Sequence, residues 1–278
     1  MRFLFSAVLF LFLLTGPAYA QPQATVYEGE IGVSLGAAHY FGDLNTRAGI
    51  NRPKPAIGLF FRKQIGPYIG VRVGGHYAQV GYSDVYSKNE FQQRRNLSFN
   101  SNLWELALQG DFNFFRFEPG NPGYQFTPYV TIGAGIFNFD PYAYLDDQKY
   151  FLRNLGTEGQ GSSLYPERQP YATMGFCFPI GMGIKYNVNS RLNVSFEISH
   201  RFTNTDYLDD VSTTYAGPAA FQSGTPAFFL QDRSYETGPL IGEAGRQRGF
   251  SGQKDQYIFA EVSLSFALSS YRCPQAKY

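Results

Sequence analysis

The sequence is short of charge, has no excess of either sign, and lacks any long hydrophobic run after residue 20. Only 16% of the 278 residues are charged, whereas about 25% is usual. The 23 basic and 22 acidic residues nearly balance, which argues against a nucleic-acid partner. No later stretch approaches 18 consecutive apolar residues, so a bundle of transmembrane helices is excluded.

Aromatic residues and glycine are abundant instead. Phe, Tyr and Trp make up 18% of the chain, and there are 30 glycines. An aromatic-rich chain of balanced charge is not intrinsically disordered. The composition also lacks the Ala, Glu, Lys and Leu bias of a coiled coil. A folded protein is therefore predicted.

The first twenty residues have the pattern of an export signal. Arg2 precedes an apolar run over residues 3–14, and a small-x-small cleavage pattern ends at Ala20. The run is shorter than a transmembrane helix needs, which disfavours the alternative of a retained anchor. The next residue is Gln21 and not cysteine, so no lipid anchor is expected there. We predict a signal peptide over 1–20 with cleavage between Ala20 and Gln21.

A period of two recurs along the mature chain. In residues 103–114, Trp104, Leu106 and Leu108 fall on one face, whereas Glu105 and Asp111 fall on the other. This alternation is typical of strands with one apolar and one polar face. Similar patterns predict eight strands, at 30–40, 56–63, 68–80, 103–114, 129–138, 176–186, 192–202 and 257–268.

Short and long connections alternate strictly between these strands. The short ones are near 64–67, 118–125 and 187–190, and the long ones are 41–55, 81–102, 139–173 and 203–256. This asymmetry predicts an all-β fold: a transmembrane, antiparallel, up-and-down β-barrel of eight strands over 21–268, with long external loops and a periplasmic tail over 269–278. A soluble sandwich or lipocalin-like fold is the alternative. A hairpin in the last loop would give ten strands.

Aromatic residues cluster near both sets of strand ends, which predicts two interfacial girdles. Ordinary core aromatics are the alternative. The predicted external girdle comprises Tyr40, Phe41, Tyr82, Phe99, Trp104, Phe139, Tyr142, Tyr171, Phe176, Phe202 and Tyr257, and the other comprises Phe114, Phe115, Phe117, Tyr124, Phe126, Tyr129 and Tyr186.

The inward phase of the strands carries charges of both signs. An eight-stranded barrel has room only for side chains, and unpaired buried charges are very unfavourable. A plugged lumen with an ion-pair network is therefore favoured over a proton or ion path. The predicted network is Glu30, Arg62, Arg72, His76, Glu105, Asp111, Lys185, Glu197, Arg201 and Glu261.

Little in the sequence suggests catalysis. Barrel enzymes need a histidine with an acid and a nucleophile, but His39 and His200 lie on the predicted lipid-facing phase, and His76 fits the lumen network better. No Gly-x-Ser-x-Gly or His-Glu-x-x-His motif occurs. Asp206, Asp209 and Asp210 could hold a hard cation, yet their spacing does not match the EF-hand loop, which favours a solvated acidic loop or a strand-end cap. We predict no catalytic residue, metal or cofactor.

The two cysteines, Cys177 and Cys273, fall at opposite ends of the predicted barrel. That separation is about 25 Å, several times what a disulfide permits. We predict that they are not bonded to each other.

Three stretches of the sequence resemble the PorG-like family, the outer-membrane barrel subunit of the type IX secretion system. They are residues 38–45, residues 102–106 and, most specifically, residues 199–212 with their unusual order of aromatics and acids. The family-like motif residues are Phe41, Gly42, Asp43, Leu44, Asn45, His200, Arg201, Asp206, Asp209 and Asp210.

The resemblance implies a non-enzymatic outer-membrane barrel that tethers a periplasmic lipoprotein ring in protein secretion and gliding. The implied partners are outer-membrane lipid and the ring lipoproteins, with no small-molecule substrate. Both chain termini are then periplasmic, and the tail and short turns are candidate contacts. A small uptake barrel or a lipid-modifying enzyme are the alternatives.

Overall fold

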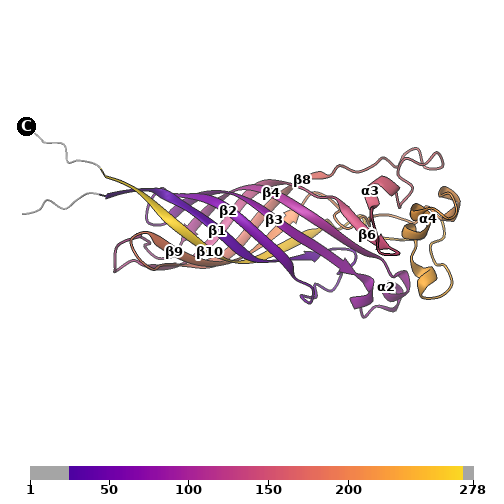
Figure 1. Ribbon diagram of the computed structural model, residues 1–278, viewed down its shortest axis with the longest axis horizontal. Helices are drawn as coiled ribbons and strands as arrows, with labels where there is room; N and C mark the ends of the chain where they lie inside the picture. Colours follow the sequence, from indigo (N-terminus) through magenta and orange to yellow (C-terminus); the bar gives the residue numbers. More distant parts are fainter. Residues whose placement is uncertain (1–24, 272–278) are drawn as a thin grey trace, which may run out of the picture.

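Eight antiparallel strands close into a barrel in the computed structural model, which describes residues 25–271 (Figure 1). Each strand pairs with its neighbour in the chain, β1 pairs with β10, and β3 with β4, so no edge is left in the ring. The strands are β1 (Thr25–Phe41), β2 (Lys54–Gln64), β3 (Ile69–Ser83), β4 (Ser98–Asn113), β5 (Phe126–Asn138), β8 (Met174–Asn187), β9 (Leu192–Thr203) and β10 (Gln256–Tyr271).

The predicted short and long connections lie at opposite ends of the barrel, but their lengths do not alternate strictly, because the link over 114–125 is as long as the loop over 42–53. The links over 65–68, 114–125 and 188–191 lie at the end of the barrel where β1 begins and β10 ends (Figure 1). Four long loops, over 42–53, 84–97, 139–173 and 204–255, cover the other end. They carry the short helices η1 (Asp84–Tyr86), α2 (Glu90–Arg95), α3 (Leu152–Leu155), η2 (Pro218–Ala220), α4 (Pro226–Gln231) and η3 (Ser234–Glu236).

An additional hairpin exists, but in the third long loop and not in the last. Strands β6 (Pro141–Leu145) and β7 (Gln148–Phe151) pair with each other, and β6 also joins the loop end of β4 through Ser101 and Asn100. In the described part of the last loop, the only strand pairing is an isolated bridge between Thr214 and Gln247. The wall itself therefore has eight strands.

None of the helices within residues 25–271 is long and apolar enough to cross a membrane.

Several strands are longer than their sequence pattern predicts, most clearly where the first and last strands meet. β1 begins at Thr25, which pairs with Tyr271, so β10 runs three residues into the predicted tail. Residues 269–271 belong to the strand because their backbone pairs with β1. Their sequence does not alternate between apolar and polar residues, so the sequence pattern did not predict this part of the strand. The predicted signal peptide, with its predicted cleavage site between Ala20 and Gln21, lies outside the described residues, as does Cys273.

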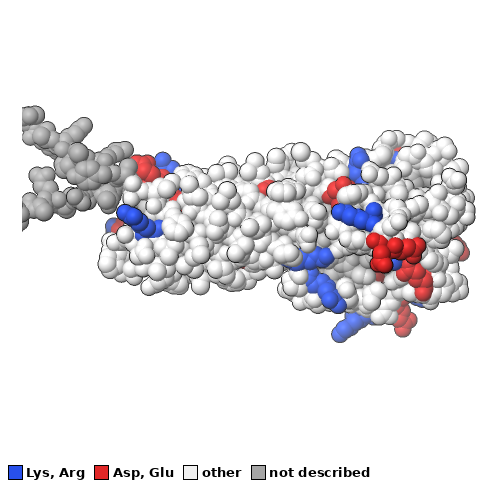
Figure 2. Space-filling view, viewed as in Figure 1, with Lys and Arg blue, Asp and Glu red and all other residues white. Residues whose placement is uncertain are grey.

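The outer face of the wall is an apolar band. Trp104, Leu106 and Leu108 are 55–62% exposed, whereas Glu105 and Asp111, in the same strand, are buried. In Figure 2 the middle of the molecule is almost free of charged side chains, and those visible gather near the two ends. Such a band, flanked by polar ends, is characteristic of barrels that span a bilayer. The protein is thus an outer-membrane type of β-barrel.

Candidate functional site: a filled lumen under a buried cap

Ion pairs fill the lumen near the end with the short turns. Arg62 Nη1 lies 2.5 Å from a Glu30 oxygen, and Arg62 Nε lies 2.8 Å from an Asp111 oxygen. Asp111 also receives Lys185 Nζ at 2.9 Å. Because all four side chains are almost fully buried, each charge depends on the others for compensation.

A second group of charges occupies the middle of the lumen. Glu105 lies 3.3 Å from Arg201 and accepts a hydrogen bond of 2.7 Å from the Tyr257 hydroxyl. His76 lies between two carboxylates, 3.5 Å from Glu105 and 3.4 Å from Glu261.

The remaining pair, Arg72 and Glu197, is 2.7 Å apart, and the Tyr129 hydroxyl donates to the same Glu197. The structure thus brings all ten residues of the predicted lumen network together inside the wall. Their side chains occupy the narrow interior that an eight-stranded barrel encloses.

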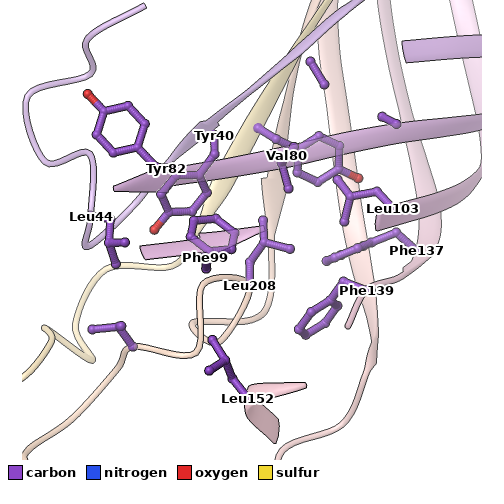
Figure 3. Packing of buried hydrophobic residues seen from close by; sticks show 14 of the residues in the cluster. Tyr40, Leu44, Val80, Tyr82, Phe99, Leu103, Phe137, Phe139, Leu152 and Leu208 are labelled. Atoms are coloured by element: carbon purple, nitrogen blue, oxygen red, sulfur yellow. The ribbon is translucent and has the colours of Figure 1, made fainter. Parts of the chain in front are cut away.

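Above the charges, a hydrophobic plug closes the lumen at the loop end (Figure 3). Phe99, Leu103 and Phe137 belong to the wall strands and point into the plug. Leu152 and Leu208 belong to the third and fourth loops and pack against them. The plug residues labelled in Figure 3 are Tyr40, Leu44, Val80, Tyr82, Phe99, Leu103, Phe137, Phe139, Leu152 and Leu208.

The plug corrects part of the predicted aromatic girdles. Trp104, Phe176 and Phe202 are exposed on the outer face as predicted. The pleat, however, turns alternate residues at the same height into the lumen. Seven residues predicted for the rims are buried, five of them in strands and Phe117 and Phe139 in the links beside them, namely Tyr40, Tyr82, Phe99, Phe117, Tyr129, Phe139 and Tyr257.

Two buried arginines join the long loops into one cap. Arg95, at the end of α2, holds both oxygens of Asp84 at 2.7 and 2.8 Å. Its Nη1 donates to the backbone carbonyl of Arg248 at 2.5 Å, and Nη2, which also binds Asp84, donates to that of Asp43 at 3.1 Å. This one side chain therefore connects the first, second and fourth loops.

Arg248 and Glu158 attach the third loop. Glu158 lies 3.2 Å from the Arg248 guanidinium and accepts hydrogen bonds from the backbone amides of Ser212 and Thr213. Arg248 also donates to the Asp210 carbonyl at 2.5 Å. None of the contacts of Arg95, Glu158 or Arg248 follows from local spacing, so sequence reasoning missed all three residues.

The acidic motif residues lie inside this cap, so of the two predicted alternatives the solvated loop is wrong. Asp206, Asp209 and Asp210 are all at least 96% buried because the other loops cover them. The Tyr40 hydroxyl lies 2.5 Å from an Asp209 oxygen and 3.1 Å from an Asp255 oxygen, so the two carboxyl groups share its single proton. In residues 25–271 no group of three or more His, Cys, Asp or Glu side chains has the geometry of a metal site.

Burial raises the pKa of these carboxyl groups. The pKa of Asp206 rises to about 7 despite a hydrogen bond from the Ser212 hydroxyl. That of Asp210 rises to about 6, with Arg248 opposing the effect of burial. For Asp209 and Asp255, burial and neighbouring aspartates hold the pKa well above its usual value.

The first motif, residues 41–45, shapes the first turn of the cap. A Cβ at Gly42 would lie 2.0 Å from an Asp255 oxygen, so only glycine fits there. Asn45 donates to the Tyr40 carbonyl at 2.9 Å and accepts from the Gly49 amide at 3.0 Å. Leu44 enters the plug. The motif residues thus act on each other and on the cap.

The histidines have structural partners. His39 is buried under the first loop, 2.6 Å from the Gly49 carbonyl. The prediction that it faces lipid is therefore wrong. His200 stays on the outer face, where it stacks on Phe41 and lies 2.7 Å from the Gln256 amide oxygen. Cys177 is buried beside Glu105, with 3.8 Å between sulfur and oxygen.

The family to which the chain belongs follows from its sequence. A protein-family model described as "Domain of unknown function (DUF6089)" matches residues 4–224, well over half of the chain. The chain belongs to this family. The match includes the first motif, the cap residues of the second and third loops, and the segment 199–212. No curated protein sequence matches.

Solved structures similar to this chain are small outer-membrane barrels. The N-terminal β-barrel domain of Pseudomonas aeruginosa OprF is 11% identical, with 87% of this chain and 100% of that chain covered and a TM-score of 0.36. Neisserial surface protein A is 7% identical, with 88% and 100% covered and a TM-score of 0.41. At these values the likeness adds no weight, and the barrel assignment rests on the strand pairing itself.

Proposed function

We propose that the protein is a non-enzymatic outer-membrane barrel of the type IX secretion and gliding machinery, and that it anchors a periplasmic lipoprotein ring. In this proposal the short turns and both termini face the periplasm, and the cap faces outward. Outer-membrane lipid and the ring lipoproteins are its partners.

The filled lumen is the observation that most supports a structural role. Ten charged or titratable side chains and an aromatic plug fill the lumen that the eight described strands enclose. A buried ion-pair network cannot open without separating charges in a medium of low dielectric constant. A small uptake barrel would need such an opening, so that alternative is disfavoured.

The chemistry around the histidines also favours a non-enzymatic role over a lipid-modifying enzyme. Their nearest polar partners are a backbone carbonyl, carboxylates and side-chain amides, as described above. A catalytic histidine of this type requires a nucleophile within hydrogen-bond reach.

The periplasmic attachment point is expected at the turn end. The turn over 114–125 is held by Glu118, which binds Arg116 at 2.7 Å and accepts from the Asn121 amide at 3.1 Å. This ordered turn lies at the same end as the exit of β10, beyond which residues 272–278 follow. Both segments can reach a periplasmic partner without crossing the membrane.

Co-purification of the full chain from outer membranes tests the proposal. We expect ring lipoproteins to be recovered with the wild type and to be reduced when residues 272–278 are deleted, a change that leaves β10 intact. Deletion of residues 222–224 in the cap is the matched control and should retain them. Absence of ring lipoproteins from the wild-type sample would contradict the tethering role.

Recordings of ion conductance in planar bilayers distinguish the structural role from the alternative of an uptake barrel. The purified barrel should show no steady conductance, because its lumen is closed at two levels. Stable ion-conducting steps from a folded sample would favour the uptake barrel.

A further inference from the structure

The wall has a notch at its loop end, where β2 is shorter than the strands on either side. β2 begins at Lys54, which pairs with Ala38, whereas β1 continues to Phe41 and β3 to Ser83. The last part of the first loop, residues 51–53, crosses this gap. The result is a cavity of about 360 Å³ at the rim of the wall, with the plug residues Tyr82 and Phe99 among those that line it.

The lining of this notch is cationic and aromatic. Arg52, Lys54 and Tyr86 line it together with Ser83 and Asn100, and no acidic residue is among the lining residues. A second cavity of about 270 Å³ shares the Tyr86 wall and adds Arg47 and Lys88, again without an acid. Blue side chains are seen where the apolar wall meets the loops in Figure 2.

The Arg52 guanidinium is positioned but not neutralised. Its central carbon lies 3.7 Å above the Tyr86 ring, a stacking contact that orients the plane. It has no ion pair with any carboxylate in residues 25–271. Lys54 Nζ donates one hydrogen bond, of 2.5 Å, to the Asn100 side chain and can donate two more. Both cations are therefore free to bind an anion.

The apolar band begins directly below these cations. Ile57 and Leu59 follow Lys54 on the same strand and are 50% and 60% exposed. Ile57 lies about 10 Å along the strand from Lys54 but on the opposite face, because Lys54 has the inward phase of Ala56 and Arg62 and reaches Asn100 at the rim through its long side chain. A ligand with an anionic head in the notch would thus lay an apolar chain along β2. This is the polarity of a lipid lying against the wall.

We propose that the notch is a binding site for the phosphate-bearing headgroup of an outer-leaflet lipid, with Arg52 and Lys54 as the phosphate donors and β2 as the acyl-chain contact. The site rests on the proposed orientation, in which the cap faces outward. Arginine and lysine are well suited to phosphate because charge-assisted hydrogen bonds are stronger than neutral ones. Juxtamembrane cations of this kind recognise anionic lipid at the surface of the bilayer.

Native mass spectrometry of the full chain in a neutral detergent tests the site. The probes are a diphosphorylated lipid A and the same lipid after removal of its phosphates. We expect the wild type to prefer the phosphorylated form by roughly tenfold. The double variant Arg52→Gln with Lys54→Gln should lose that preference.

A matched control carries the same charge change at the opposite end of the wall. Lys63 and Arg191 are exposed near the short turns, so Lys63→Gln with Arg191→Gln should leave the preference intact. Gel mobility before and after heating shows that each variant is folded. The milder Arg52→Gln with Arg47→Gln serves if loss of Lys54 disturbs the strand end.

Three outcomes would overturn the proposal. The first is equal binding of both lipids by the wild type, and the second is a preference that survives in the double variant. The third is competition by inorganic phosphate at the concentration of lipid, which would assign the notch to a free anion. None of these affects recovery of ring lipoproteins, so the two proposals fail independently.

Discussion

The lumen and the cap are both buried and rich in charge, yet they compensate it differently. In the lumen, Arg62, Arg72, Lys185, Arg201 and His76 face five carboxylates, each within 4 Å of a basic group. In the cap, Arg95 and Arg248 pair with Asp84, Glu158 and Asp210, while Asp206, Asp209 and Asp255 have no basic partner in the described chain. The lumen is held by charge pairs throughout, whereas the cap combines such pairs with carboxyl groups whose raised pKa lets them share protons.

Removal of an arginine from the lumen should lower the free energy of unfolding more than any other change to the lumen or the cap. Arg62→Met leaves Glu30 without its ion pair and weakens Asp111, so we expect a loss of about 3–5 kcal/mol in the free energy of unfolding. Urea titration followed by Trp104 fluorescence measures it, since this single tryptophan faces outward. Arg116→Met, on an exposed turn, is the control and should leave the midpoint unchanged. Equal midpoints for both variants would contradict the ion-pair account.

Removing an arginine from the cap should act locally. Arg248→Met breaks the contacts to Glu158 and the Asp210 carbonyl, and we expect about 2–3 kcal/mol of lost stability in the cap. Hydrogen exchange should accelerate at residues 206–213 while the wall strands keep their protection. If the wall amides exchange faster as well, the two regions are not separate cooperative units.

The shared protons make the cap sensitive to pH in a direction opposite to that of a salt bridge. The pKa of Asp206 is near 3.8 when unfolded and about 7 in the fold, so its protonated form stabilises the cap. That stability is complete below about pH 4 and is lost as pH rises through about 7. After allowance for solvent screening, the change is about 1–2 kcal/mol.

Hydrogen exchange at the Leu208 amide, corrected for its intrinsic rate, measures this loss. Asp255 accepts that amide at 2.9 Å, so protection reports on the cap. The neutral isostere Asp206→Asn should flatten the pH profile. A wild-type profile that is already flat between pH 5 and 8 would show that the carboxylates are compensated in another way.

The smallest expected effect is a change in how fast the Cys177 thiol reacts, which tests whether the plug stays closed. Cys177 is fully buried below the plug, and burial and the Glu105 contact keep it unreactive. In a Cys273→Ser background, maleimide should not label the folded wild type, whereas Arg248→Met should permit slow labelling. Rapid labelling of the wild type would mean that the lumen opens.

Strand alternation predicted the wall because the pleat enforces it over ten or more residues. It placed Glu105 and Asp111 inside and Trp104 outside, as the structure has them. At the rims the predictions for Tyr40 and Phe99 were wrong. These residues were assigned to the girdles because they lie near strand ends, although the alternation of their strands places their side chains in the lumen. The hairpin of β6 and β7 carries no such repeat and was not predicted.

The cap could not be predicted, because its contacts join residues far apart in the sequence. Arg95 and Arg248 are 153 positions apart, and Tyr40 reaches Asp209 across 169. The segment 199–212 was singled out for its order of residues, but whether its aspartates face water depends on three other loops. That dependence is a property of the assembled fold.

The joining of four loops by two arginines also decides where the protein can be tagged on its surface. An epitope inserted near Asp43, Glu158 or Arg248 would separate groups that hold the other loops, and all four would be disturbed at once. Residues 222–224 precede α4, are exposed, and a side chain added at Gly224 would meet nothing within 4 Å. A peptide tag placed between Ser223 and Gly224 would extend into solvent and leave the loops joined.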